Sequence, residues 1–199
     1  MNSCGSGRYA PIIPAMSTDG LSAALADARR GDEQAISVLY RAINPTLLRY
    51  LRHHAGPIAE DLASEVWMAI APRLAEFTGD IDELRALMFT VARRRAVDHH
   101  RRERRRPATV AFDEAFDRAA QGETADLAVA RLTAQGAVET LVRHLSEEQA
   151  EIVLLRVLAD LDVAHVAAIV GKSKGAVRVA QHRALQHLQQ VWDRGAVTP

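Results

Sequence analysis

The chain has 199 residues, of which 48% are hydrophobic and 5% aromatic, so it is too apolar for a disordered protein. It carries 25 basic and 25 acidic residues, and this zero net charge indicates neither an acidic nor a basic partner. A single cysteine excludes an internal disulfide and a cysteine metal cluster. The scarcity of aromatic residues favours an all-α fold over a β-sandwich or barrel.

The first twenty residues lack the long apolar centre of a signal peptide, and no apolar run approaches the length of a membrane span. We therefore expect a disordered tail over 1–20, with Met1 or Met16 as the start. The protein is expected to be cytoplasmic, with no membrane contact.

Residues 21–105 show helical spacing of apolar side chains throughout. Two helices are predicted over 21–30 and 32–52, and Pro45 is expected to kink or split the second. A third helix is predicted over 58–75.

A turn at 78–80 then precedes a fourth helix, for which Asp82 is a plausible N-cap. The apolar positions of this helix run directly into eight arginines between Arg93 and Arg106, which face two acidic residues and give a local charge of +6. Because the basic block continues an amphipathic helix, we favour a nucleic-acid contact over a merely solvated face.

Residues 107–135 carry five acidic and two basic residues, and we interpret them as an acidic linker that runs into the next helix. Residues 107–123 show no clear period, and a helix is predicted over 124–143. The sequence Ser146-Glu147-Glu148-Gln149 predicts a capping box. The helix that it opens is expected to bury a stripe from Ala150 to Leu161 that includes Val157.

Asp162 is expected to cap a short helix that Gly171 ends. A longer helix then runs to about Trp192, so that the two form a helix-turn-helix. Lys174, Arg178, Gln181 and His182 are expected on its outer face. The alternative to a DNA-binding helix-turn-helix is a three-helix bundle whose outer face is merely solvated.

Five segments, taken in order, resemble the bacterial extracytoplasmic-function (ECF) group of sigma factors in the sigma-70 family. Residues 59–67 (AEDLASEVW) resemble the polymerase-binding pattern (E)DLxQE(V/T), and 85–93 (RALMFTVAR) resemble the promoter-melting pattern (R)AWLYTIAR. Residues 96–102 resemble its AxDxxRR continuation. Residues 145–161 and 171–183 resemble the two helices of the C-terminal domain.

The resemblance implies two helical domains joined by a flexible linker: a region 2-like domain over 21–106 and a region 4-like domain over 136–192, with a short tail over 193–199. It implies a transcription initiation factor that binds core RNA polymerase, reads the −10 element with the first domain and reads the −35 element with the second. An anti-sigma factor is a further expected partner.

The resemblance also assigns roles to individual residues. The residues expected to contact core polymerase are Asp61, Leu62, Glu65, Val66 and Trp67. A half-exposed Trp67 would be an interface anchor, although it could equally belong to the core.

The residues expected to contact −10 DNA are Phe77, Asp82, Arg93, Arg94, Arg95, Arg101 and Arg102. Those expected to contact −35 DNA are Ser173, Lys174, Arg178, Val179, His182 and Arg183. Arg178 is the best candidate for a bidentate contact to guanine, because its planar fork matches that base edge.

No enzyme activity, metal or cofactor is expected. The adjacent histidine pairs His53-His54 and His99-His100 should point apart on a helix, and neither has Cys or Glu at zinc spacing. A stand-alone helix-turn-helix regulator with an N-terminal sensor domain remains the alternative function, and it predicts no affinity for polymerase.

Overall fold

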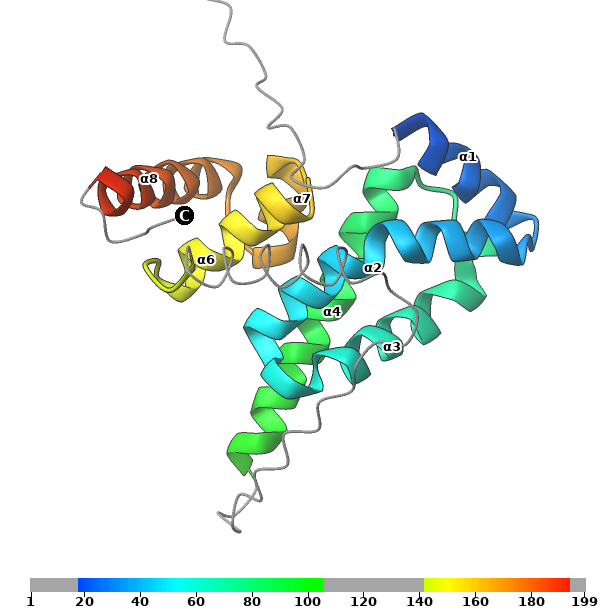
Figure 1. Cartoon of the computed structure of the whole chain (residues 1–199), viewed down its shortest axis with the longest axis horizontal. Coiled ribbons are helices and arrows are strands. Elements are labelled where there is room, and N and C mark those ends of the chain that lie inside the picture. The colour runs from blue at the N-terminus through cyan, green and yellow to red at the C-terminus, as the bar shows by residue number, and fades with distance from the viewer. Residues whose placement is uncertain (1–17, 106–141, 194–199) are drawn as a thin grey trace, which may run out of the picture.

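The computed structural model describes residues 18–105 and 142–193, and every element among them is helical (Figure 1). The N-terminal half comprises α1 (Thr18–Arg29), α2 (Glu33–Ala55), η1 (Gly56–Ile58), α3 (Ala59–Ile70), η2 (Ala71–Glu76) and α4 (Ile81–Arg105). The C-terminal half comprises α6 (Glu147–Val153), the π-helical turn η3 (Leu154–Leu158), α7 (Val163–Val170) and α8 (Lys174–Asp193). These elements confirm the all-α prediction for the described residues.

Four predicted helix ends are confirmed because local side chains satisfy the free backbone groups there. Asp32 accepts hydrogen bonds from the backbone N–H groups of the first turn of α2 at 2.8 and 3.2 Å. Ser146 and Gln149 form the reciprocal capping box. Asp162 accepts from the backbone of His165 at 2.7 Å, which lowers the pKa of its carboxyl. Gly171 ends α7 with φ +69°, a conformation that favours glycine.

Two predictions about helix boundaries are wrong. Helix α1 begins at Thr18, so the expected tail over 1–20 is too long by its last three residues; residues 1–17 lie outside the described part. Helix α2 continues through Pro45, so the split considered there does not occur; buried Leu39 and Leu51 anchor the helix on both sides of the proline. The third helix changes to a 3-10 helix after Ile70, where Pro72 cannot supply an amide hydrogen.

The helix opened by Ser146 also departs from the predicted regular stripe. Its α-helical part ends at Val153 and a π-helical turn follows, which rotates the side chains after it. Val157 is therefore 37% exposed, whereas Leu161 is fully buried beyond the turn. The predicted linker and most of the helix predicted over 124–143 lie outside the described residues.

One continuous apolar core joins the two halves. In the N-terminal half, α2, α3 and α4 surround Leu47, Val66 and Met88, all of which are fully buried. In the C-terminal half, Ile152 and Val177 hold α6 and α8 together. Helix α7 packs against α4, and the π-helical turn packs against α2. The far end of α4 extends away from this contact (Figure 1).

Candidate nucleic-acid interface

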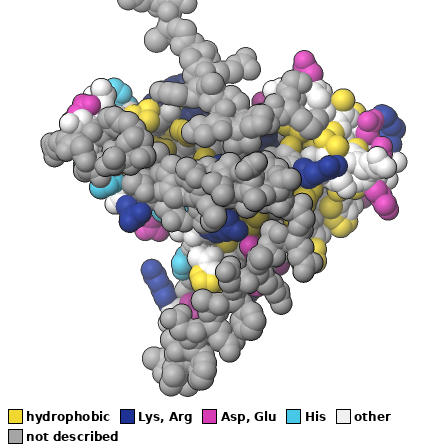
Figure 2. All heavy atoms as spheres, in the orientation of Figure 1, with side chains coloured by type: hydrophobic (Ala, Val, Ile, Leu, Met, Phe, Trp, Pro, Cys, Tyr) yellow, Lys and Arg dark blue, Asp and Glu magenta, His cyan; other side chains and the backbone are white. Residues whose placement is uncertain are grey.

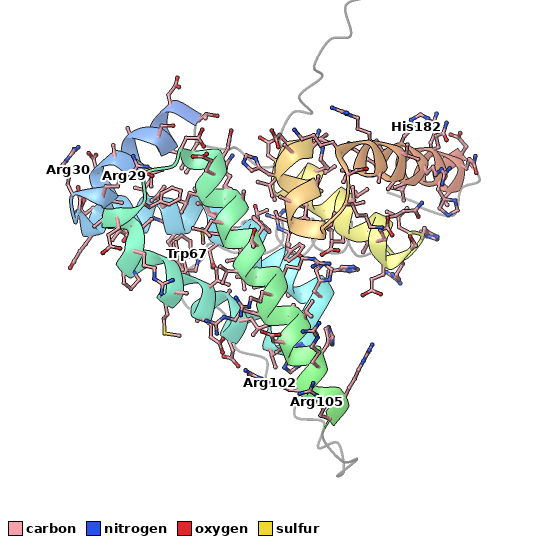
Figure 3. The ribbon with its side chains drawn as sticks, turned by 180° about the vertical axis from the view of Figure 1, so that it is seen from behind. Arg29, Arg30, Trp67, Arg102, Arg105 and His182 are labelled. Atoms are coloured by element: carbon pink, nitrogen blue, oxygen red, sulfur yellow. The ribbon has the colours of Figure 1, made fainter. Side chains whose placement is uncertain are left out.

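The far end of α4 presents an exposed cationic surface. Residues 101–105 are all exposed, and Figure 3 shows Arg102 and Arg105 at the tip of the helix, away from the C-terminal half. Asp98 lies 4.0 Å from Arg94 and 3.8 Å from Arg101, and the Arg94 side chain is 85% exposed. Contacts of this length between exposed groups are weak, so these guanidinium groups remain available to a polyanion.

Two arginines nearer the core are held by carboxylates from other elements. The Nε atom of Arg93 donates to Glu151 in α6 at 2.7 Å, and this hydrogen bond raises the pKa of Arg93. Arg95 pairs with Glu65 of α3. The structure therefore joins one residue expected to bind DNA to another expected to bind polymerase.

The loop before α4 packs closely around Phe77. The guanidinium of Arg29 lies 5.6 Å from the centre of the Phe77 ring and donates to the carbonyl oxygen of Gly79. A Cβ atom at Gly79 would lie 2.5 Å from the Glu83 carboxylate and 2.6 Å from the Phe77 ring, so a larger residue there would force these side chains to shift.

The N-cap of α4 is Asp80, and the prediction of Asp82 is wrong. Asp80 accepts hydrogen bonds from the backbone N–H groups of Asp82 and Glu83 at 3.0 and 2.8 Å, and its own N–H donates to the Glu83 carboxylate at 2.9 Å. Asp82 is exposed in the first turn and lies 3.4 Å from Arg85. Asp80 is the better cap because its position lets one carboxylate satisfy two free amides.

A small apolar hollow of about 100 Å³ lies beside this loop, between η2 and α4. Phe77, Leu84, Leu87 and Val91 are among its lining residues. Leu87 is an apolar residue of α4 and is 38% exposed. Helical spacing did not reveal this hollow, because the spacing assigns apolar side chains to one face of a single helix. It does not show the gap between two helices.

The expected polymerase-contact segment is buried on one face. Leu62, Val66 and Trp67 are at most 7% exposed, whereas Asp61 is exposed. The Trp67 indole Nε1–H donates to the Asn44 side chain at 3.0 Å, and its ring lies 5.1 Å from Tyr40 (Figure 3). Of the two alternatives left open for Trp67, the structure supports the core residue and not the half-exposed anchor.

The outer face of α8 presents the residues expected there, with one exception. Ser173, Lys174, Arg178, Val179, His182 and Arg183 are all exposed. Figure 3 shows His182 on the outer side of the helix. Gln181, however, accepts a hydrogen bond at 3.1 Å from Arg156 of the π-helical turn. It therefore holds two elements of the domain together, and its expected place on the free face is wrong.

Neither histidine pair belongs to a metal site in the described part of the chain, where no group of three or more ligating side chains occurs. The rings of His53 and His54 lie 4.8 Å apart in an edge-on arrangement, so they do not point fully apart. Burial lowers the pKa of His54 to about 4. Helices long and apolar enough to cross a membrane do not occur among the described residues.

Charges of both signs are interspersed on the face in Figure 2, as far as its described atoms show. Sequence analysis did not single out Glu151, because no local pattern connects this carboxylate to Arg93.

The comparisons with known proteins agree with this architecture. Family models for sigma-70 region 2 and sigma-70 region 4 match residues 39–106 and 135–188. The chain is 33% identical over 189 residues to the ECF RNA polymerase sigma factor SigD of Mycobacterium tuberculosis, covering 89% of this chain and 87% of SigD. It is 31% identical over 166 residues to the ECF RNA polymerase sigma factor BldN of Streptomyces coelicolor, covering 82% of this chain and 62% of BldN.

A solved structure shares the fold. CnrH, in complex with the cytosolic domain of CnrY, matches with a TM-score of 0.58 at 20% identity, covering 88% of this chain and 99% of CnrH. The two region models and the similarity to SigD over most of both chains replace the alternative of a stand-alone regulator. The chain belongs to the ECF RNA polymerase sigma factors of the sigma-70 family, which act in transcription initiation.

Proposed function

We propose that this sigma factor reads the −10 element with the N-terminal domain and the −35 element with α8. The observation that carries the proposal is the pair of exposed cationic faces, one on the end of α4 and one on α8, which lie on separate halves of the molecule. Phosphate contacts from such faces supply affinity, and side chains that reach base edges supply specificity.

At the −10 element, the arginines of residues 101–105 hold the phosphates of the opened strand. An unstacked base rests against Phe77 and the apolar hollow beside it, because stacking on an aromatic side chain compensates for lost base stacking. The contact between Arg29 and Phe77 fixes the ring before DNA arrives. Arg93, Arg94 and Arg95 lie on the helix that continues from this hollow.

At the −35 element, Arg178 reaches a base edge in the major groove, with Val179 and His182 beside it. Arg183 and Lys174 contact phosphates. Ser173 accepts from the backbone N–H of Ala176 at 3.2 Å, so it orders the first turn of α8 that approaches the DNA.

Core polymerase binds to the acidic edge of α3, where Asp61 is exposed and Glu65, one turn further along, is partly buried and paired with Arg95. The buried residues Leu62, Val66 and Trp67 set the position of this edge from inside the core and do not touch the partner. An anti-sigma factor is proposed as a further partner on the family resemblance. Phosphodiester chemistry belongs to the polymerase, and this chain supplies no catalytic group of its own.

A pull-down of core RNA polymerase tests the polymerase contact. The Asp61→Arg/Glu65→Arg variant should lose binding, because charge reversal repels a basic partner surface. A Glu33→Arg/Glu76→Arg variant reverses two exposed carboxylates elsewhere in the N-terminal domain and should bind like the wild type. Equal loss in both variants would reject the α3 edge, and no binding by the folded wild type would reject the proposal.

A further inference from the structure

One carboxylate connects the two halves of the molecule. Glu151 of α6 accepts hydrogen bonds from Arg93 Nε at 2.7 Å and from Arg93 Nη2 at 3.4 Å, and Arg93 lies on α4 in the N-terminal half. The Tyr50 hydroxyl of α2 donates to the same carboxylate at 3.2 Å. The Glu151 side chain is only 13% exposed, so these partners replace most of its hydration.

The surroundings make this contact strong. Tyr50 is 1% exposed and packs edge-on against Phe89 at 5.3 Å, while its other neighbour His54 lies 4.4 Å away. Around them, α7 packs on α4 and the π-helical turn packs on α2. In such a poorly hydrated place an ion pair is strengthened, and the loss of either partner leaves a costly unpaired charge.

The packed arrangement conflicts with simultaneous contact to two promoter elements. Their centres lie about 25 base pairs apart, or about 85 Å along the duplex at about 3.4 Å per base pair. A compact chain of this length has a radius of gyration of about 16 Å. The halves must therefore separate before α4 and α8 reach their elements together.

We propose that Glu151 is an intramolecular latch. Its carboxylate holds the C-terminal half on α2 and α4 and withholds the Arg93 guanidinium from DNA, so that engagement of the promoter requires this contact to break. The latch rests on the proposed role of Arg93 in DNA binding. The rest of the cationic surface, over residues 101–105, stays exposed in the closed state and is free to make the first contact.

The distance between the halves tests closure. Spin labels on cysteines introduced by Ser37→Cys and Gln189→Cys, both exposed positions, report it in the full chain with Cys4→Ser. Glu151→Gln and Glu151→Arg should lengthen the distance, whereas Glu148→Gln should not, because Glu148 pairs at 2.7 Å with Lys172 of its own half. An unchanged distance in Glu151→Arg with native helix content would overturn the latch.

A charge-exchange variant distinguishes loss of the ion pair from misfolding of the single variants. Arg93→Glu/Glu151→Arg restores an ion pair of the opposite polarity, so its distance should return towards that of the wild type. If the exchange variant stays as open as Glu151→Arg while both retain native helix content, the specific pair does not hold the halves together.

Binding of a labelled mixed-sequence single-stranded DNA tests whether Arg93 is withheld. Glu151→Gln should bind this probe about tenfold more tightly than Glu148→Gln, which carries the same net charge, since opening removes the population cost of the closed state. Equal affinities of the two variants, with the halves of Glu151→Gln further apart, would overturn the proposal that the latch withholds Arg93. The polymerase pull-down judges the proposed function separately, because it addresses the acidic edge of α3, to which neither Arg93 nor Glu151 belongs.

Discussion

The N-terminal and C-terminal DNA faces use the same side chains in different electrostatic settings. On α8, Arg178 and Arg183 are exposed. On α4, Arg94 and the far end are comparably exposed, whereas Arg93 and Arg95 are paired with carboxylates from α6 and α3. A local charge of +6 along the sequence therefore overstates what α4 offers to DNA in the closed molecule. Charge that is free for a partner depends on tertiary neighbours and not on the count along the chain.

Removal of the exposed charge on α4 is expected to have the largest effect on DNA binding. The variant with Arg101, Arg102, Arg104 and Arg105 all changed to Ala loses four phosphate contacts, so DNA affinity should fall about a hundredfold. The slope of log affinity against log salt for single-stranded DNA should become shallower by about 3. Titration of single-stranded DNA at several salt concentrations measures both. An unchanged slope would show that these arginines do not contact phosphates.

Measurements of the free energy of unfolding distinguish the buried face of α3 from its exposed edge. Trp67→Ala creates a cavity and leaves the Asn44 amide without its indole donor, so the free energy of unfolding should fall by about 3–5 kcal/mol. Asp61→Ala, on the exposed edge, should change it by less than about 0.5 kcal/mol. Urea unfolding followed by circular dichroism measures both variants. Similar losses in the two would contradict the core assignment of Trp67.

The buried His54 should make the stability of the folded chain depend on pH. Burial lowers its pKa to about 4 from an ordinary value of 6.5, so the unfolded chain binds a proton at a higher pH than the folded chain. The stabilising effect is complete above pH 6.5 and is lost as the pH falls from 6.5 towards 4, by up to about 3 kcal/mol. Unfolding curves across this range should show a His54→Phe variant to be less pH-dependent than the wild type. Parallel curves would remove His54 as the cause.

Substitutions of two nearby residues on α8 should affect DNA recognition and protein stability independently. Arg178→Ala should weaken −35-dependent binding by about 1–3 kcal/mol and leave the melting temperature unchanged. Gln181→Ala should instead lower stability by about 1 kcal/mol, since it leaves Arg156 without this acceptor. Promoter binding and thermal unfolding measured on both variants test the contrast. Reversed outcomes would exchange the two roles.

Several helix ends could be predicted because their causes lie within a few residues. The caps at Asp32, Ser146 and Asp162 each satisfy amides of the adjacent turn, and Gly171 supplies a left-handed conformation. The exposure of α8 followed from helical spacing for most of its residues. Asp80 and Asp82 show the limit of such reasoning, because both are plausible caps two residues apart and only the backbone geometry distinguishes them.

By itself, the sequence determined the helical class, the order of the two domains and the resemblance to ECF sigma factors, because these depend on periodicity, local caps and motif order. Only the tertiary structure decided that Trp67 is buried and that Gln181 faces inward. It also decided that Arg93 and Glu151, 58 residues apart, meet across the two halves. Helical spacing assigns a side chain to a face, but the partner that covers that face comes from elsewhere in the chain.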